Sequence, residues 1–260
     1  MLKYIINFQK NILTYLYLKY VENKSVDISN EKTVLSFLNL DKFDKVLFIG
    51  LNKKDLLTKY IKNNNYKNIE IYDPSSIKIE KSKNAHLNGF IPSTNSRWKD
   101  YYADEEFDTA GTFFEKDLRW IAYNKNKKFE LKKEKSKLIL SEKNPYDLLF
   151  LSLNGSELEY LKEIQKEINL FKIIKIEYSE FNIDSKTFIK DYIMYFKEND
   201  FEIFFQGRSS LVHLSKYNTE LENKYNRIYY FFNKKHITKI NYKNKSSYRL
   251  ENYVDKKNFS

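Results

Sequence analysis

The chain has 260 residues, of which 42% are hydrophobic and 17% aromatic, a composition typical of a globular protein that buries a substantial core. Its formal net charge is +11 and it contains no cysteine, which excludes disulfides and thiolate metal sites and is typical of a reducing compartment, so we expect a cytoplasmic protein. The three histidines, His86, His213 and His236, follow no zinc or iron motif, and we expect no metal site.

Residues 1–40 are predicted to form an amphipathic helix and a linker. Apolar residues recur at helical spacing over 1–21, but Lys3, Lys10 and Lys19 interrupt the run. The segment therefore lacks the unbroken apolar length of a membrane span, and it shows no small-residue cleavage site. We expect a helix that caps the domain core, and docking on a membrane surface is the alternative.

Two strands joined by a helix are predicted next. The strands cover 45–50 and 68–73, and apolar residues at helical spacing over 56–61 predict the helix between them. Gly50 would let a ligand approach the end of the first strand, and Asp73 could accept two hydrogen bonds from a ribose diol at the end of the second. This succession is typical of the opening half of a nucleotide-binding α/β sheet.

The turn after the first strand lacks the glycine pattern of dinucleotide sites. Lys53 and Lys54 stand where further glycines are expected for a pyrophosphate. A smaller nucleoside ligand is therefore favoured over a dinucleotide.

Residues 75–146 show no clear succession of strands and helices. A helix is compatible with 77–87, and the segments 113–123 and 127–140 are ambiguous between strand and helix. We expect an irregular insertion here, with loops that form a lid facing the substrate.

A second unit of strand, turn, helix and strand is predicted over 147–178. Its first apolar run ends near Ser152, its turn contains Asn154, and its second apolar run leads to Glu177. Ligands of parallel sheets bind beyond the carboxyl ends of the strands. We therefore expect these three residues to lie close to the functional site.

A helix and two further strands complete one α/β domain over 41–235. The helix is predicted over 188–196 and the strands over 201–205 and 225–232. Residues 236–260 are expected to form a basic C-terminal extension.

Positive charge gathers near the C-terminal end of the chain. Residues 206–260 contain 12 lysines and arginines against 4 acidic residues, interleaved with tyrosines. Such a surface attracts polyanions, including nucleic acid, phosphate-bearing glycans and anionic lipid. A solvated basic face without a partner is the commoner explanation, and it stays open beside the others.

The strand ends resemble those of the FkbM-type methyltransferases, a branch of the class I methyltransferases that use S-adenosylmethionine. The resemblance rests on Phe48–Lys54, Asp73–Pro74, Phe150–Glu157 and Ile176–Glu177, and it covers roughly residues 41–235. It implies a Rossmann-like three-layer α/β sandwich, with a mostly parallel sheet and one antiparallel strand near the C-terminal end. It also implies S-adenosylmethionine as the cofactor and a hydroxyl of a sugar or glycan as the methyl acceptor. The basic C-terminal region favours an acceptor that carries phosphate or carboxylate.

The same resemblance implies a set of site residues. Those expected at the cofactor are Ile49, Gly50, Leu51, Asn52, Asp73, Pro74, Ser152 and Asn154. A sugar hydroxyl must also lose its proton, for which a carboxylate or imidazole is needed. The candidates are Glu177, Glu157 and His213. For Glu157, stabilisation of the start of a helix by its negative charge is an equally good explanation.

Three departures from the family pattern leave other functions open. Phe48 and Ser152 replace acidic residues, and Lys54 replaces a glycine. The lost acids motivate a catalytically degenerate binding or scaffold protein. The basic, tyrosine-rich end motivates a nucleic-acid-binding or RNA-modifying protein. No particular oligomeric state is predicted.

Overall fold

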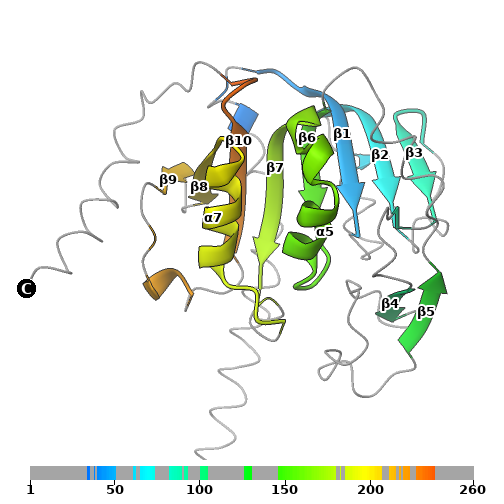
Figure 1. Ribbon diagram of the computed structural model, residues 1–260. Coiled ribbons are helices and arrows are strands. Elements are labelled where there is room, and N and C mark those ends of the chain that lie inside the picture. Colours follow the sequence, from blue (N-terminus) through cyan, green and yellow to red (C-terminus); the bar gives the residue numbers. More distant parts are fainter. Residues whose placement is uncertain are drawn as a thin grey trace, which may run out of the picture.

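An eight-stranded mixed sheet organises the chain in the computed structural model (Figure 1). The structure describes residues 34–35, 38, 40–50, 61–62, 65–73, 82–89, 91–92, 100–104, 126–130, 146–179, 182, 185–206, 211–214, 217, 219–222 and 227–237. The helix expected over 1–21 lies outside the described residues, as do Leu51, Asn52, Pro74 and the basic extension beyond Ile237.

The strands of the main sheet come from both ends of the described chain. In spatial order they are β3 (Ala85–Asn88), β2 (Tyr66–Tyr72), β1 (Phe43–Ile49), β6 (Tyr146–Leu151), β7 (Phe171–Tyr178), β10 (Arg227–Asn233), β8 (Phe201–Gln206) and β9 (Leu211–His213).

The direction of the strands confirms the predicted fold class. Five neighbouring strands pair in parallel: β3, β2, β1, β6 and β7. When these five are numbered along the chain, their spatial order is 3-2-1-4-5, the order of a doubly wound nucleotide-binding sheet. Strand β10 runs antiparallel to both of its neighbours, β7 and β8. The chain therefore has a Rossmann-like α/β fold with an antiparallel strand near its C-terminal end. Strand β9, antiparallel to β8, adds a third antiparallel pairing at the edge.

The central strands form because their side chains are buried on both faces. Every residue of β6 is buried, as are the last four residues of β1. Alternate residues enter opposite layers: Leu47 and Ile49 belong to one core cluster, and Val46 and Phe48 to the other. Continuous apolar runs of this kind are typical of parallel strands covered on both sides.

Helices supply the outer layers. Helices α5 (Glu157–Glu163) and α7 (Ile189–Glu198) cover one face of the sheet (Figure 1), and α5 continues into a 3₁₀ turn at Gln165–Leu170. On α7, the ring of Phe196 stacks on Phe231 of β10 with centroids 3.6 Å apart. The described residues Val34, Leu35 and Ile61 pack in the cluster on the other face, giving three layers.

The described residues of the region 75–146, for which an irregular insertion is expected, include three strands. Strand β3 extends the main sheet beside β2, so the helix expected over 77–87 is wrong for its last residues, because pairing with the edge of the sheet overrides the local helical spacing. Strands β4 (Asp100–Asp104) and β5 (Asn126–Glu130) form a separate antiparallel pair.

The described residues contain neither a membrane-spanning helix nor a metal-binding cluster. No helix in them is long and apolar enough to cross a membrane. Histidine and acidic side chains in the same part of the chain form no cluster able to hold a metal ion.

Candidate functional site

The carboxyl ends of β1, β2 and β6 meet at one edge of the sheet. The backbone N–H of Gly50 donates to the carbonyl of Tyr72 over 3.0 Å, and the N–H of Ser152 donates to the carbonyl of Ile49 over 3.1 Å. Asp73 follows Tyr72 directly. The structure therefore brings together the strand ends that carry Gly50, Asp73 and Ser152.

Gly50 is required by the packing of this edge. Its φ of +78° is in the left-handed region, and a Cβ added to it would lie 2.6 Å from the carbonyl oxygen of Ser152 and collide with the side chain of Leu153. On this side, glycine lets the end of β1 come close to the two residues that follow β6. The glycine in the sequence thus has a structural reason that is independent of any ligand.

Asp73 is fully buried, and it pairs with β3. Its exposed fraction is 0%, and its backbone N–H donates to the carbonyl of Asn88 over 2.9 Å. A ribose could reach this carboxylate only by displacing the groups that now cover it.

Asn88 is a candidate that the sequence analysis missed. Its side-chain nitrogen is buried and has no hydrogen-bond partner in the structure as described, and it stands at the end of β3 beside Asp73. A buried donor without an acceptor is costly unless a ligand supplies one. The signal available in the sequence was the dipeptide Asn88–Gly89, which marks a turn after an apolar residue.

The turn between β6 and α5 has left-handed backbone at two successive residues. Asn154 has φ +43° and Gly155 has φ +87°, conformations that asparagine and glycine tolerate better than other residues. Asn154 is partly exposed, whereas Ser156 after it is fully buried. The turn therefore presents Asn154 at the same edge as Ser152.

The carboxylate of Glu157 holds this turn from within. It accepts hydrogen bonds from the backbone N–H of Leu153 (2.8 Å) and of Gly155 (3.0 Å). It also accepts from the side-chain amide of Asn182 (3.0 Å) and from the hydroxyl of Tyr192 (3.2 Å). Burial raises the pKa of this carboxyl above its ordinary value, and the hydrogen bonds oppose that rise. These partners account for Glu157 without a substrate.

A second set of hydrogen bonds ties the segment after β7 to the same turn. The hydroxyl of Ser185 donates to the carbonyl of Gly155 over 2.9 Å. The side-chain oxygen of Asn182 accepts from the backbone N–H of Ser179 over 2.8 Å. The Asn154 turn is thus braced by residues that follow the neighbouring strand.

The three expected proton acceptors occupy different places. Glu157 is 1% exposed and is engaged as described. Glu177 is the next-to-last residue of β7, partly buried, and because Leu151 pairs with Ile176 it lies level with Ser152. It is therefore the candidate at the edge.

His213 lies elsewhere. It ends β9 at the far side of the sheet, opposite Phe204, whose ring centroid is 5.0 Å from that of the imidazole. Two strands, β10 and β8, separate β9 from β7, which places His213 about 14 Å away from β7 at the usual spacing of strands. The structure does not bring His213 to the edge that carries Asp73.

The chemistry of the edge fits a nucleoside such as that of S-adenosylmethionine. Once the groups that cover it are displaced, Asp73 can accept hydrogen bonds from two ribose hydroxyls, and Asn88 and Asn154 can each donate to a nitrogen or oxygen of the ligand. Of the residues expected at the cofactor, Leu51, Asn52 and Pro74 lie outside the described residues.

Comparisons with known proteins give weak likenesses. No family model matches the chain, and no curated protein matches it. Among solved structures, the methyltransferase domain of bacterial CtHen1-CN is similar at 11% identity and a TM-score of 0.39, covering 78% of this chain and 96% of that one. Precorrin-8w decarboxylase from Methanobacterium thermoautotrophicum is similar at 8% identity and a TM-score of 0.35, covering 80% and 90%. At these values neither likeness bears on function.

Proposed function

We propose that this chain binds S-adenosylmethionine at the shared edge of β1, β2 and β6 and transfers its methyl group to a hydroxyl of a sugar or glycan. The observation that supports the proposal most is the hydrogen bonding that joins the ends of these strands, with Gly50, Asp73 and Ser152 at adjacent tips. The acceptor class rests on the resemblance to the FkbM-type methyltransferases.

The residues of the edge have distinct parts in this proposal. The cofactor, when bound, supplies an electrophilic methyl group on a sulfonium. Asp73 would hold the ribose and Asn154 would orient the ligand, so that the acceptor oxygen lies in line with the methyl carbon. Glu177 would accept the proton of the acceptor hydroxyl as the new O–CH₃ bond forms and the S–CH₃ bond breaks.

Binding is tested by thermal unfolding with S-adenosylhomocysteine. A ligand at about 100 times its dissociation constant stabilises a fold by roughly 2.7 kcal/mol, which for a chain of this size raises Tm by roughly 5–10 °C. The variant Asp73→Asn should lose this rise, and Asp41→Asn, an exposed aspartate before β1, should keep it. No rise at millimolar ligand in the unaltered protein would refute the proposed cofactor.

Catalysis is tested separately with a labelled methyl group. Glu177→Gln should slow transfer to an accepting glycan about a hundredfold or more, the usual contribution of a positioned base. It should leave the rise in Tm with S-adenosylhomocysteine unchanged. An unchanged rate of transfer would show that Glu177 is not the proton acceptor.

A binding protein without catalysis is the second candidate. It is favoured by the full engagement of Glu157 and the remote position of His213, which leave one of the three expected proton acceptors at the edge. This candidate predicts a rise in Tm with S-adenosylhomocysteine but no methyl transfer to any glycan offered. A nucleic-acid function rests on the basic end of the chain, most of which lies outside the described residues.

A further inference from the structure

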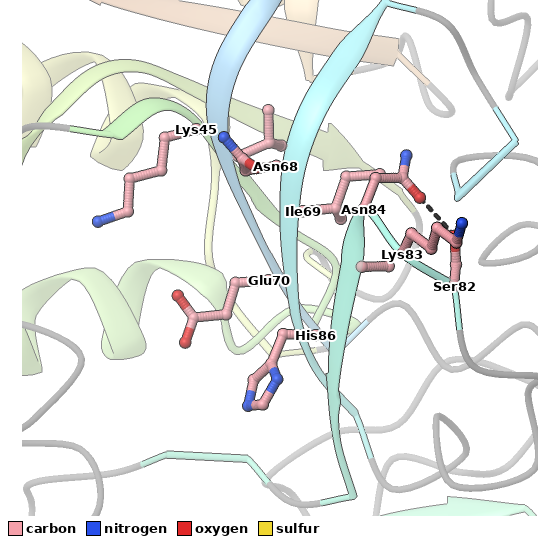
Figure 2. A pocket seen from close by; sticks show the side chains of 10 residues that line it. Lys45, Asn68, Ile69, Glu70, Ser82, Lys83, Asn84 and His86 are labelled. Carbon is pink, nitrogen blue, oxygen red and sulfur yellow. Dashed lines mark hydrogen bonds between the residues drawn. The ribbon is translucent and has the colours of Figure 1, made fainter.

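A hollow of about 460 Å³ lies over the first half of β1, β2 and β3, away from the edge described above (Figure 2). Figure 2 shows Lys45, Glu70 and His86 projecting from the three neighbouring strands to the same side. Asn68 and the turn that precedes β3 complete the lining. We propose that this hollow is a binding site for a neutral saccharide unit.

Glu70 is the fixed acceptor of the hollow. The hydroxyl of Tyr72 donates to one of its carboxylate oxygens over 2.6 Å, and the hydroxyl of Tyr146 donates to the other over 2.9 Å. Two donors leave lone pairs on both oxygens, and Glu70 forms no salt bridge in the part of the chain that the structure describes. The carboxylate is therefore held in one orientation with accepting capacity left for a ligand.

Donors stand on either side of Glu70. The ammonium of Lys45 lies 4.0 Å from the centroid of the Tyr146 ring, next to the carboxylate that Tyr146 binds. His86 pairs in register with Glu70 on the adjacent strand and is exposed, and its imidazole has no hydrogen bond to another described residue. Across the three neighbouring strands, the hollow thus presents a hydrogen-bond donor, an acceptor and a second donor in alternation.

This alternation selects the class of ligand. A simple anion would face the carboxylate of Glu70, and a simple amine would face the ammonium of Lys45, so each would meet a like charge. A sugar hydroxyl can donate to Glu70 while it accepts from Lys45 or His86, and neighbouring hydroxyls repeat this pattern. The volume falls within the range of small-molecule sites.

The hollow is distinct from the proposed cofactor edge. Glu70 lies on β2, and Asp73 directly follows this strand, three residues later. Three residues of extended chain span about 10 Å. The hollow and that edge are therefore separate places along β2. Binding at the hollow can be measured with no cofactor present, so its outcome is independent of the proposed methyl transfer.

The test is titration of the isotope-labelled full chain with maltotriose and with the trimer of N-acetylglucosamine, followed by NMR. We expect saturable shifts of the backbone amides of Glu70 and His86 with at least one of these sugars. The variant His86→Ala should weaken that binding about tenfold, the loss expected from one good hydrogen bond. His236→Ala, which removes an exposed histidine outside the hollow, should not weaken it.

Inorganic phosphate and ethylamine serve as charged probes in the same titration. Saturation by neither sugar, even at tens of millimolar, would overturn the proposal. So would tighter binding of phosphate or ethylamine than of both sugars at the same amides. An equal affinity in His86→Ala and the unaltered protein would remove His86 from the site and contradict the proposed alternation.

Discussion

The side-chain amide of Asn182 donates a hydrogen bond to the carboxylate of Glu157 over 3.0 Å, joining the segment after β7 to the start of α5. Both side chains are buried, with exposed fractions of 0% and 1%. The same carboxylate holds the backbone of the Asn154 turn. Glu157 therefore acts on the candidate site through the turn, as a positioning residue.

Replacement of Glu157 by alanine should lower the free energy of unfolding by about 3 kcal/mol. The change leaves two backbone N–H groups, the amide of Asn182 and the hydroxyl of Tyr192 without their acceptor in a buried place. Urea unfolding measures the loss. Glu159→Ala on the same helix, which removes a partly exposed ion pair with Lys162, should stay within about 0.5 kcal/mol. Equal losses in the two variants would contradict a bracing role for Glu157.

The ionisation of Glu157 should also make stability depend on pH. Burial raises its pKa in the folded state above the ordinary 4.5, so the folded protein holds this proton more tightly than the unfolded chain does. The resulting stabilisation is fully present below the ordinary pKa and is lost as the pH rises through the raised one. Glu157→Gln lacks this contribution. The free energy of unfolding of the unaltered protein, minus that of Glu157→Gln, should therefore fall across this window, and a flat difference would contradict the raised pKa.

The variant Gly50→Ala should be destabilised by about 3 kcal/mol. A left-handed backbone costs an alanine roughly 1–2 kcal/mol, and the new methyl group would be forced against Ser152 and Leu153, which costs a further 1–3 kcal/mol or so. Asn154→Gly is the matched control, because glycine relaxes the left-handed backbone there. It should change stability by less than about 1 kcal/mol. Thermal or urea unfolding distinguishes them, and a stable Gly50→Ala protein would show that β1 and β6 can separate at this point.

Glu222 should control the titration of Tyr217. The pKa of Tyr217 is raised to about 12. Burial is the largest cause, and the hydrogen bond from the Tyr217 hydroxyl to Glu222 is the next. In Glu222→Gln this pKa should move back toward the ordinary value of 10.0, because the neighbouring negative charge is gone. NMR of labelled tyrosine, with Tyr217→Phe to assign the signal, follows the change. An unaltered pKa would mean that burial and the charge of Asp191 set it without Glu222.

The same Glu222→Gln variant should weaken the start of α7. The carboxylate of Glu222 also accepts hydrogen bonds from the backbone N–H groups of Ile189 (2.9 Å) and Lys190 (3.1 Å). These are the first N–H groups of the helix, which have no partner within it. We expect a loss of about 1–2 kcal/mol in the free energy of unfolding. A loss confined to a few tenths would show that a neutral amide oxygen caps the helix as well as the carboxylate does.

The sequence predicts the strands that are buried on both faces. The apolar runs that end at Gly50 and Leu153 become β1 and β6, which pair with each other in parallel. Their length and content of β-branched and aromatic residues favour strands, and a continuous apolar run is stable as a strand when both of its faces are buried. The place of Gly50, Asp73 and Ser152 at one edge follows from the parallel order of the strands.

Other features could not be predicted because they depend on tertiary pairing. Strand β3 has four residues, Ala85–Asn88, of which none is fully buried, so its apolar signal is weak and its strand conformation comes from β2 beside it. The hydrogen bonds of Glu157 reach Asn182 and Tyr192, which are 25 and 35 residues away. No local pattern shows that an acid at the start of a helix will be buried under a segment so distant.

The position of β10 has a consequence for how the protein is made. This strand occupies the middle of the second half of the sheet, hydrogen-bonded to β7 on one side and to β8 on the other, although it is the last of the sheet's strands to leave the ribosome. Until Arg227–Asn233 emerges, the edges of β7 and β8 that β10 will cover are unpaired in the nascent chain. They must not pair with each other or with a neighbouring molecule during this time. A chain that stops short of this segment would therefore tend to aggregate rather than to persist as a smaller fold.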